Sequence, residues 1–152
     1  VPPQLRNRLG IAIAYRTHAA HRELLASARW QDLAGKGARP QRLLWASTGT
    51  KEPSASDTLY VEALALSGTI NTLPEKTLLA FADHGRPSLA DVAAMAAAEA
   101  TLTSFEQYGV DLQALAQRLQ DDGTQLFVKS WKQLLQRIAT KRLALAGGVA
   151  GQ

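Results

Sequence analysis

Cysteine is absent from this 152-residue chain, and aromatic residues make up only 6% of it. Without a thiol the protein has no disulfide scaffold, no thiolate zinc site and no cysteine nucleophile. The chain also lacks an apolar run of the roughly 18 residues that a membrane span needs. Its longest candidate, residues 90–100, is interrupted by Asp91 and Glu99. These absences exclude disulfide-rich secreted and integral membrane classes, and they favour a reducing, cytoplasmic location.

The overall composition is that of an ordinary soluble globular domain. Hydrophobic residues account for 46% of the chain and charged residues for 20%, which argues against extensive disorder. The first residues, Val1-Pro2-Pro3, include neither a starting methionine nor a signal-peptide apolar region. We therefore expect the chain to be processed or cut from a longer protein.

A net charge of +4 and an isoelectric point near 9.7 favour anionic partners without identifying one. The basic residues are scattered along the chain, which is typical of a solvated surface. A basic, mainly helical module that binds nucleic acid or a partner protein is the alternative function. No nucleic-acid motif and no interleaving of basic and aromatic residues supports it. We therefore expect no nucleic-acid and no membrane partner.

Hydrophobic periodicity and turn residues predict a helix-rich chain with two short strands. The predicted helices lie at about residues 4–27, 30–33, 59–66, 75–84, 89–108, 112–122 and 126–145, and the predicted strands at residues 42–47 and 69–73. Ser88 is expected to cap the fifth of these helices. Ser56 or Asp57 is expected to cap the third helix, and Asp111 the sixth. Gly85 is expected in a left-handed conformation after its helix, and Gly123 is expected to break the helical run.

Strands that alternate with helices predict parallel pairing through right-handed crossovers. Two short strands cannot complete a parallel sheet, and each would leave one edge without a neighbour. The sequence therefore predicts an α/β architecture in which this chain is one piece of a larger domain.

The loop after the first predicted strand is the best candidate for a binding site. It reads Ser47-Thr48-Gly49-Thr50-Lys51 and combines hydroxyl groups, backbone N–H groups and a lysine at the carboxyl end of a parallel strand. Such a loop suits a phosphate, although an ordinary strand-to-helix connection would have a similar composition. Lys51 is a poor candidate for a Schiff-base nucleophile, because the neighbouring Glu52 favours the charged ammonium.

Other residue patterns carry no chemistry. His18 and His21 share a helix face, but with only His84 left they do not supply the ligands of a metal site. Neither a dinucleotide-binding glycine motif nor a phosphate-loop motif is present. The stripe that includes Phe127 and Trp131 has helical spacing, and we interpret it as core.

Three segments carry a resemblance to a known family. Residues 42–53, RLLWASTGTKEP, resemble the RPLWASTGTKNP segment of bacterial transaldolases. Residues 56–64, SDTLYVEAL, and residues 69–74, TINTLP, are similar to the family's SDTLYVDEL and TVNTMP. The resemblance covers most of the chain, and the branch includes bifunctional proteins that fuse transaldolase to glucose-6-phosphate isomerase.

The resemblance implies a (β/α)8 TIM barrel, with residues 42–47 as strand 7 and residues 69–73 as strand 8. Residues 1–146 would then form the C-terminal portion of the barrel domain, followed by a flexible tail at 147–152. Transaldolases of the pentose phosphate pathway transfer a dihydroxyacetone unit between sugar phosphates, from sedoheptulose 7-phosphate to glyceraldehyde 3-phosphate, through a lysine Schiff base. That lysine lies on strand 4, upstream of this chain, so the chain alone would hold no catalytic residue and be inactive.

The resemblance also implies what this chain contributes to the intact enzyme. Ser47 matches a position that contacts the substrate phosphate, and Lys51 lies near a basic phosphate ligand. Glu52 departs from the family's asparagine and adds a negative charge there. Neither a cofactor nor a metal is implied. The expected partners are sugar-phosphate substrates and, through the open sheet edges, the remainder of the barrel or a second copy of the chain.

Overall fold

The computed structural model describes residues 1–90 and 92–148 of the chain. It divides into two compact units, Val1–Tyr108 and a second unit that begins at Gly109. The first unit contains the 3-10 helix η1 (Pro3–Leu5), the helices α1 (Leu9–Ala26), α2 (Ala28–Gly35), α3 (Leu59–Ala63), α4 (Glu75–His84), α5 (Val92–Ala96) and α6 (Ala98–Gln107), and the strands β1 (Leu43–Trp45) and β2 (Thr69–Asn71). The second contains α7 (Leu112–Gly148).

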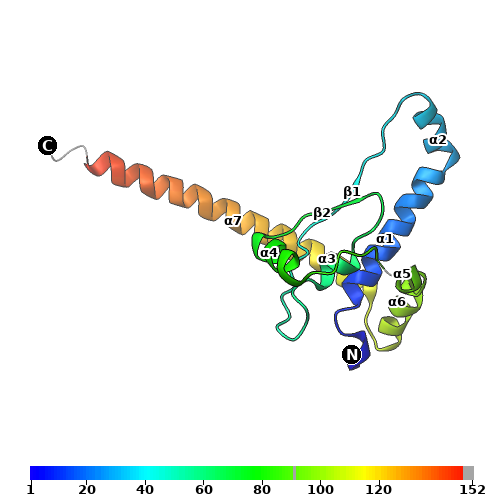
Figure 1. Cartoon of the computed structure of the whole chain (residues 1–152). Coiled ribbons are helices and arrows are strands. Elements are labelled where there is room, and N and C mark those ends of the chain that lie inside the picture. Colours follow the sequence, from blue (N-terminus) through cyan, green and yellow to red (C-terminus); the bar gives the residue numbers. More distant parts are fainter. Residues whose placement is uncertain (91, 149–152) are drawn as a thin grey trace. The chain divides into compact units, whose positions relative to one another are not determined.

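The two strands lie side by side and pair in parallel, as the sequence predicts (Figure 1). Leu43 pairs with Thr69 and Trp45 with Asn71, so the carboxyl ends of both strands lie at the same edge of the sheet. Each strand is shorter than predicted. Among the described residues neither strand has a second neighbour, so each leaves one edge of backbone N–H and C=O groups unpaired.

One face of this sheet is also uncovered. Leu44 and Ile70 are adjacent across the strands and remain 48% and 37% exposed. Trp45 points to the opposite face and is buried, as alternation along a strand requires. An exposed apolar face of this kind suits further packing against protein.

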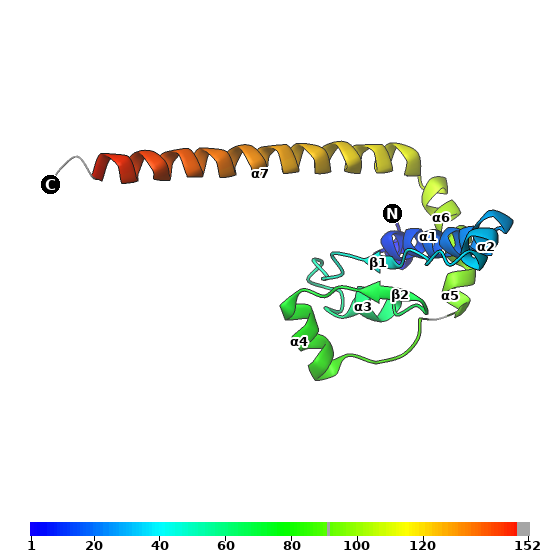
Figure 2. The ribbon, with the colours of Figure 1, turned by 90° about the horizontal axis from the view of Figure 1, so that it is seen from above.

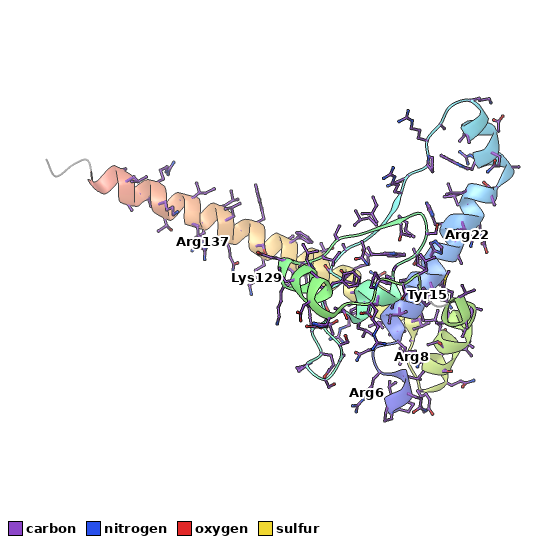
Figure 3. All side chains as sticks on the ribbon, in the orientation of Figure 1. Arg6, Arg8, Tyr15, Arg22, Lys129 and Arg137 are labelled. Carbon is purple, nitrogen blue, oxygen red and sulfur yellow. The ribbon has the colours of Figure 1, made fainter. Side chains whose placement is uncertain are left out.

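Helix α1 packs on α6 and forms the core of the first unit with it. Leu102 of α6 is fully buried, and Phe105 on the same helix is almost as fully buried. Arg16 on α1 forms two hydrogen bonds, of 2.8 and 2.7 Å, with the carboxylate of Glu99 on α6. The Tyr15 hydroxyl, labelled in Figure 3, donates to the carbonyl of Ala63 at the end of α3. These contacts join α1 to α6 and to α3.

Helices α1 and α3 begin or end at residues other than those predicted. The first helix is not continuous from residue 4, because Asn7 adopts a left-handed φ of 60° between η1 and α1. Helix α3 stops at Ala63, short of residue 66, and its N-cap is Thr58 without a side-chain cap, so neither Ser56 nor Asp57 has the predicted role. The Ser56 hydroxyl instead accepts a hydrogen bond from the Thr58 N–H.

Glycine is needed at position 85 for a reason other than the one predicted. Gly85 is extended, with φ −66°, so the left-handed assignment is wrong. A Cβ atom at this position would lie 2.2 Å from Phe81 Cδ2 and 2.5 Å from the Phe81 carbonyl oxygen. Close approach of the chain to the last turn of α4 therefore excludes a side chain here.

The predicted helix at 89–108 is two helices, α5 and α6, which are separated at Ala97. Leu89 and Ala90 are not helical, so the predicted cap at Ser88 is wrong. The helical segment ends as predicted at Gly109, which has a left-handed φ of 82°.

The described part of the second unit is dominated by one long helix, α7, which Figure 2 shows without a break. The Asp111 carboxylate accepts a hydrogen bond from the Ala114 N–H at 2.9 Å, so the predicted cap is confirmed. Gly123 lies inside α7, and the predicted break is wrong. An isolated glycine costs a helix about 1 kcal/mol, which the flanking turns of helix-favouring residues outweigh.

The apolar residues on α7 that the sequence predicts to be core are exposed: Phe127 is 81% exposed and Trp131 is 60% exposed. The helix includes Gly147 and Gly148, the first two residues of the expected tail, and residues 149–152 lie outside the described part of the chain. Within residues 1–90 and 92–148, no helix combines the length and the apolar composition that a membrane span requires.

Candidate phosphate-binding site

The loop that follows β1 is fixed to β2 by hydrogen bonds at its beginning. The Thr48 side chain is buried, and its hydroxyl donates to the Thr72 carbonyl at 2.8 Å. In return, the backbone N–H and the hydroxyl of Thr72 donate to the Trp45 carbonyl at 3.0 and 2.9 Å. Thr48 therefore anchors the loop, and its hydroxyl is already occupied by this anchor.

Ser47 makes the turn from the strand into this loop. Its φ is 59°, a left-handed conformation that is uncommon for a residue other than glycine. Such a conformation costs about 1 kcal/mol or more and persists only where surrounding contacts impose it. The side chain is exposed, so the hydroxyl remains available to a ligand at the carboxyl edge of the sheet.

Gly49 brings the loop against the beginning of α4. A Cβ atom at position 49 would lie 3.2 Å from Pro74 Cγ and 3.3 Å from Thr77 Oγ1. Thr77 is buried in the first turn of α4. The loop after one strand thus lies directly on the helix that follows the next strand.

The N-terminus of α4 presents its first backbone N–H groups at this contact. The first N–H groups of a helix have no partner within the helix, and the N-cap, Pro74, provides no side-chain cap. These groups and the helix dipole favour an anion. The end of the loop and the first turn of α4 carry Lys51, Glu52, Glu75 and Lys76, whose charges sum to zero. The attraction for an anion therefore comes from the N–H groups rather than from net charge.

Two polar residues have unused hydrogen-bonding groups: Thr50, in the loop predicted from the sequence, and Asn71, which the sequence did not indicate. Thr50 Oγ1 and both side-chain polar atoms of Asn71 are buried, and they have no hydrogen-bond partner among the described residues. Buried polar groups almost always have hydrogen-bond partners. The side chains of Thr50 and Asn71 can therefore still form hydrogen bonds with a ligand or with another part of the protein. Asn71 ends β2, and its position at a strand end is the only sequence signal that could have indicated it.

Ser47 and Lys51, the two phosphate-binding residues predicted from the sequence, lie in this loop. Unlike Thr48 and Gly49, they do not anchor it to neighbouring elements of the described chain. Ser47 and Lys51 are both exposed, and neither side chain has a hydrogen bond or ion pair among the described residues. The structure brings Gly49 and Thr48, rather than Ser47 and Lys51, into contact with neighbouring elements. Thr48 and Gly49 therefore fix the conformation of the loop, and the exposed side chains of Ser47 and Lys51 are available to bind a ligand.

The histidines of α1 are engaged in structural contacts. His18 is buried, with Nε2 3.3 Å from the Ser67 carbonyl oxygen, and His21 Nε2 lies 3.0 Å from that of Gln41. Within residues 1–90 and 92–148, no three histidine or carboxylate side chains gather closely enough to hold a metal ion.

Comparison with known proteins gives consistent matches over nearly the whole chain. A sequence model of the transaldolase/fructose-6-phosphate aldolase family matches residues 3–138. A transaldolase of Thermobifida fusca is 47% identical over 141 residues, which are 92% of this chain and 38% of the relative. One of Thiobacillus denitrificans is 47% identical over 134 residues, 88% of this chain and 37% of the relative. The chain thus spans less than two fifths of the length of these curated relatives.

Proposed function

The chain belongs to the transaldolase/fructose-6-phosphate aldolase family, and we propose that it is the C-terminal part of a transaldolase barrel. In this assignment β1 and β2 are the seventh and eighth strands of a (β/α)8 barrel, and α3 is the crossover helix between them. The parallel register of β1 and β2 supports the assignment. So do the unpaired outer edges of the two strands, because every strand of a closed barrel has two neighbours.

The proposed role of the chain is to hold the phosphate of the sugar substrates. The observation that carries this proposal is the contact of Gly49 with the uncapped N-terminus of α4. In (β/α)8 barrels, the loops after strands 7 and 8, together with a helix N-terminus, frequently form a phosphate site. Ser47 and Lys51 would complete the site with a hydroxyl donor and an ammonium.

The intact enzyme would transfer a dihydroxyacetone unit between sugar phosphates. The reaction starts with attack of a lysine amine on the ketose carbonyl, and that lysine comes from the part of the barrel outside this chain. Residues of this chain would orient the substrate by its phosphate, which lowers the barrier through positioning and not through bond chemistry. The chain by itself would bind sugar phosphates without turning them over.

The remainder of the barrel is the proposed partner of the open sheet. The unpaired edges of β1 and β2 and the exposed face at Leu44 and Ile70 would pair with and pack against it. A second copy of the chain would satisfy the same edges when the remainder is absent.

One specific observation favours the alternative, a basic interaction module. Residues 123–148 of α7 contain five lysine or arginine residues and no acidic residue, and two of them, Lys129 and Arg137, are labelled in Figure 3. Binding to duplex DNA that falls steeply with salt would support this alternative.

Replacing Ser47 by alanine in a full-length enzyme that contains this segment tests the proposed site. We expect the KM for sugar phosphates to rise several-fold, with kcat at saturating substrate little changed, because the contact with the phosphate is made equally in the bound substrate and in the transition state. Ser54→Ala is the matched control, since the Ser54 hydroxyl donates to Glu52 within the same loop. Loss of Schiff-base formation in the Ser47 variant at saturating substrate, measured by borohydride trapping, would contradict the assigned role.

A further inference from the structure

His84, the last residue of α4, lies between two carboxylates. Its Nε2 atom is 2.9 Å from Asp57 Oδ1, and its Nδ1 atom is 3.1 Å from Asp83 Oδ2. Asp83 precedes it on the same helix, whereas Asp57 lies 27 residues earlier, shortly before α3. The contact with Asp57 is therefore the one that joins two separate segments.

Asp57 is at the far end of the loop that begins at Ser47. The near part of this loop rests on the N-terminus of α4 through Gly49, and the far part meets its C-terminus through Asp57. A second link reinforces the far attachment: Glu62 Oε1 accepts hydrogen bonds from the Thr58 hydroxyl at 2.9 Å and the Arg86 N–H at 3.1 Å. Helix α4 thus holds both ends of the loop.

Only the protonated ring satisfies both carboxylates. A neutral imidazole has one N–H donor and one lone pair, so one of the two carboxylates would face a lone pair. Hydrogen bonds to Asp57 and then to Asp83 raise the pKa of His84, and the hydrogen bond from His84 lowers the pKa of Asp57. Lys76 also acts on Asp57, lowering its pKa in the same direction.

We propose that His84 is a positioning residue for the phosphate site, whose protonated ring holds Asp57 and with it the loop that carries Ser47 and Lys51. The inference rests on the proposed phosphate-binding function of that loop. Because the pKa of His84 is raised and that of Asp57 is lowered on forming the contact, the attachment is strongest at pH values between these two pKa values. It weakens as the pH rises through the raised pKa of His84. Anion affinity is expected to fall over the same interval.

Sulfate is the appropriate probe, because it remains a dianion throughout this pH range. Titration of the full chain, followed by the backbone amide signals of Gly49 and Thr77, gives the affinity at each pH. We expect affinity in the native chain to fall about two- to fivefold as His84 deprotonates, the scale of an exposed ion pair. His84→Gln and Asp57→Asn should bind weakly at every pH and lose this dependence.

Asp83→Asn is the matched control, since it removes the carboxylate that does not cross to the loop. With Asp83 gone, neutral His84 can donate to Asp57 through Nε2, so the variant should bind sulfate well and with less dependence on pH. Equal affinity and an equal pH profile in the native chain and the His84→Gln variant would overturn the inference.

A readout without ligand separates this inference from the proposed function. Amide relaxation of residues 50–56 should show greater mobility in His84→Gln and Asp57→Asn than in the native chain. Failure of the native chain to bind sulfate would contradict the phosphate site, whereas unchanged loop mobility in both variants would contradict the positioning role of His84.

Discussion

Replacing Gly49 by alanine tests whether the loop must touch α4 to bind phosphate. The backbone of Gly49 lies outside the left-handed region, so an added side chain is opposed only by its neighbours. Its Cβ atom would stand 3.2 Å from Pro74 Cγ and 3.3 Å from Thr77 Oγ1. Ordinary carbon contacts are about 3.5–4.0 Å, so the loop or the helix must move by a few tenths of an ångström.

The expected size of the effect follows from this overlap. Overpacking of such a contact costs about 1–2 kcal/mol, at the lower end of the usual range, because only two atoms are too close. A cost of this size in the binding conformation displaces the loop in most molecules. About one molecule in five to one in thirty then keeps the conformation that binds phosphate. The apparent dissociation constant for phosphate should rise by the same factor, about 5- to 30-fold.

The measurement is a titration with inorganic phosphate, followed by the amide signals of residues 47–51. Gly10→Ala is the control, since its Cβ would meet only Tyr60 Cε1 at 3.9 Å, an ordinary contact. Adding Pro74→Ala to the Gly49→Ala variant removes the ring atom in the way and should restore part of the affinity. Unchanged affinity in the single variant would refute the reasoning that the contact forms the site.

Two further predictions concern the scaffold. Leu102→Ala removes a fully buried side chain between α6 and α1 and should lower the free energy of unfolding of the first unit by about 2–5 kcal/mol, measured by urea titration. Leu145→Ala, at an exposed position of α7, should leave it unchanged, and equal losses would contradict the assigned core. Asp111→Ala removes the cap of α7 and should weaken that helix by about 0.5–2 kcal/mol. Circular dichroism on heating would show earlier loss of helix, and an identical melting curve would contradict the capping role.

The sequence predicted the elements whose signals are local. The strands containing Trp45 and Ile70 are short apolar or β-branched runs bounded by turn residues, and α4 begins and ends where proline and glycine mark it. The parallel pairing followed from their alternation with helices. The loop from Ser47 to Lys51 was identified for the same reason, because its small and polar residues follow a strand.

Features that depend on contacts between distant segments could not be predicted. The close approach of Gly49 to Pro74 and the extended backbone of Gly85 arise from packing on α4. Gly123 carries the same residue-level signal as Gly109, yet only Gly109 has the left-handed backbone of a helix end. Asn71 is recognisable as a polar group with spare hydrogen-bonding capacity only once its burial is known.

Titration of the chain with fructose 6-phosphate tests the central claim most directly, with unphosphorylated fructose as the reference ligand. If the loop after β1 and the start of α4 form a phosphate site, the sugar phosphate will shift the amide signals of residues 47–51 and 75–77. Fructose will leave those signals in place. Absence of shifts in these two segments, or equal shifts with both sugars, would contradict the assignment of the site.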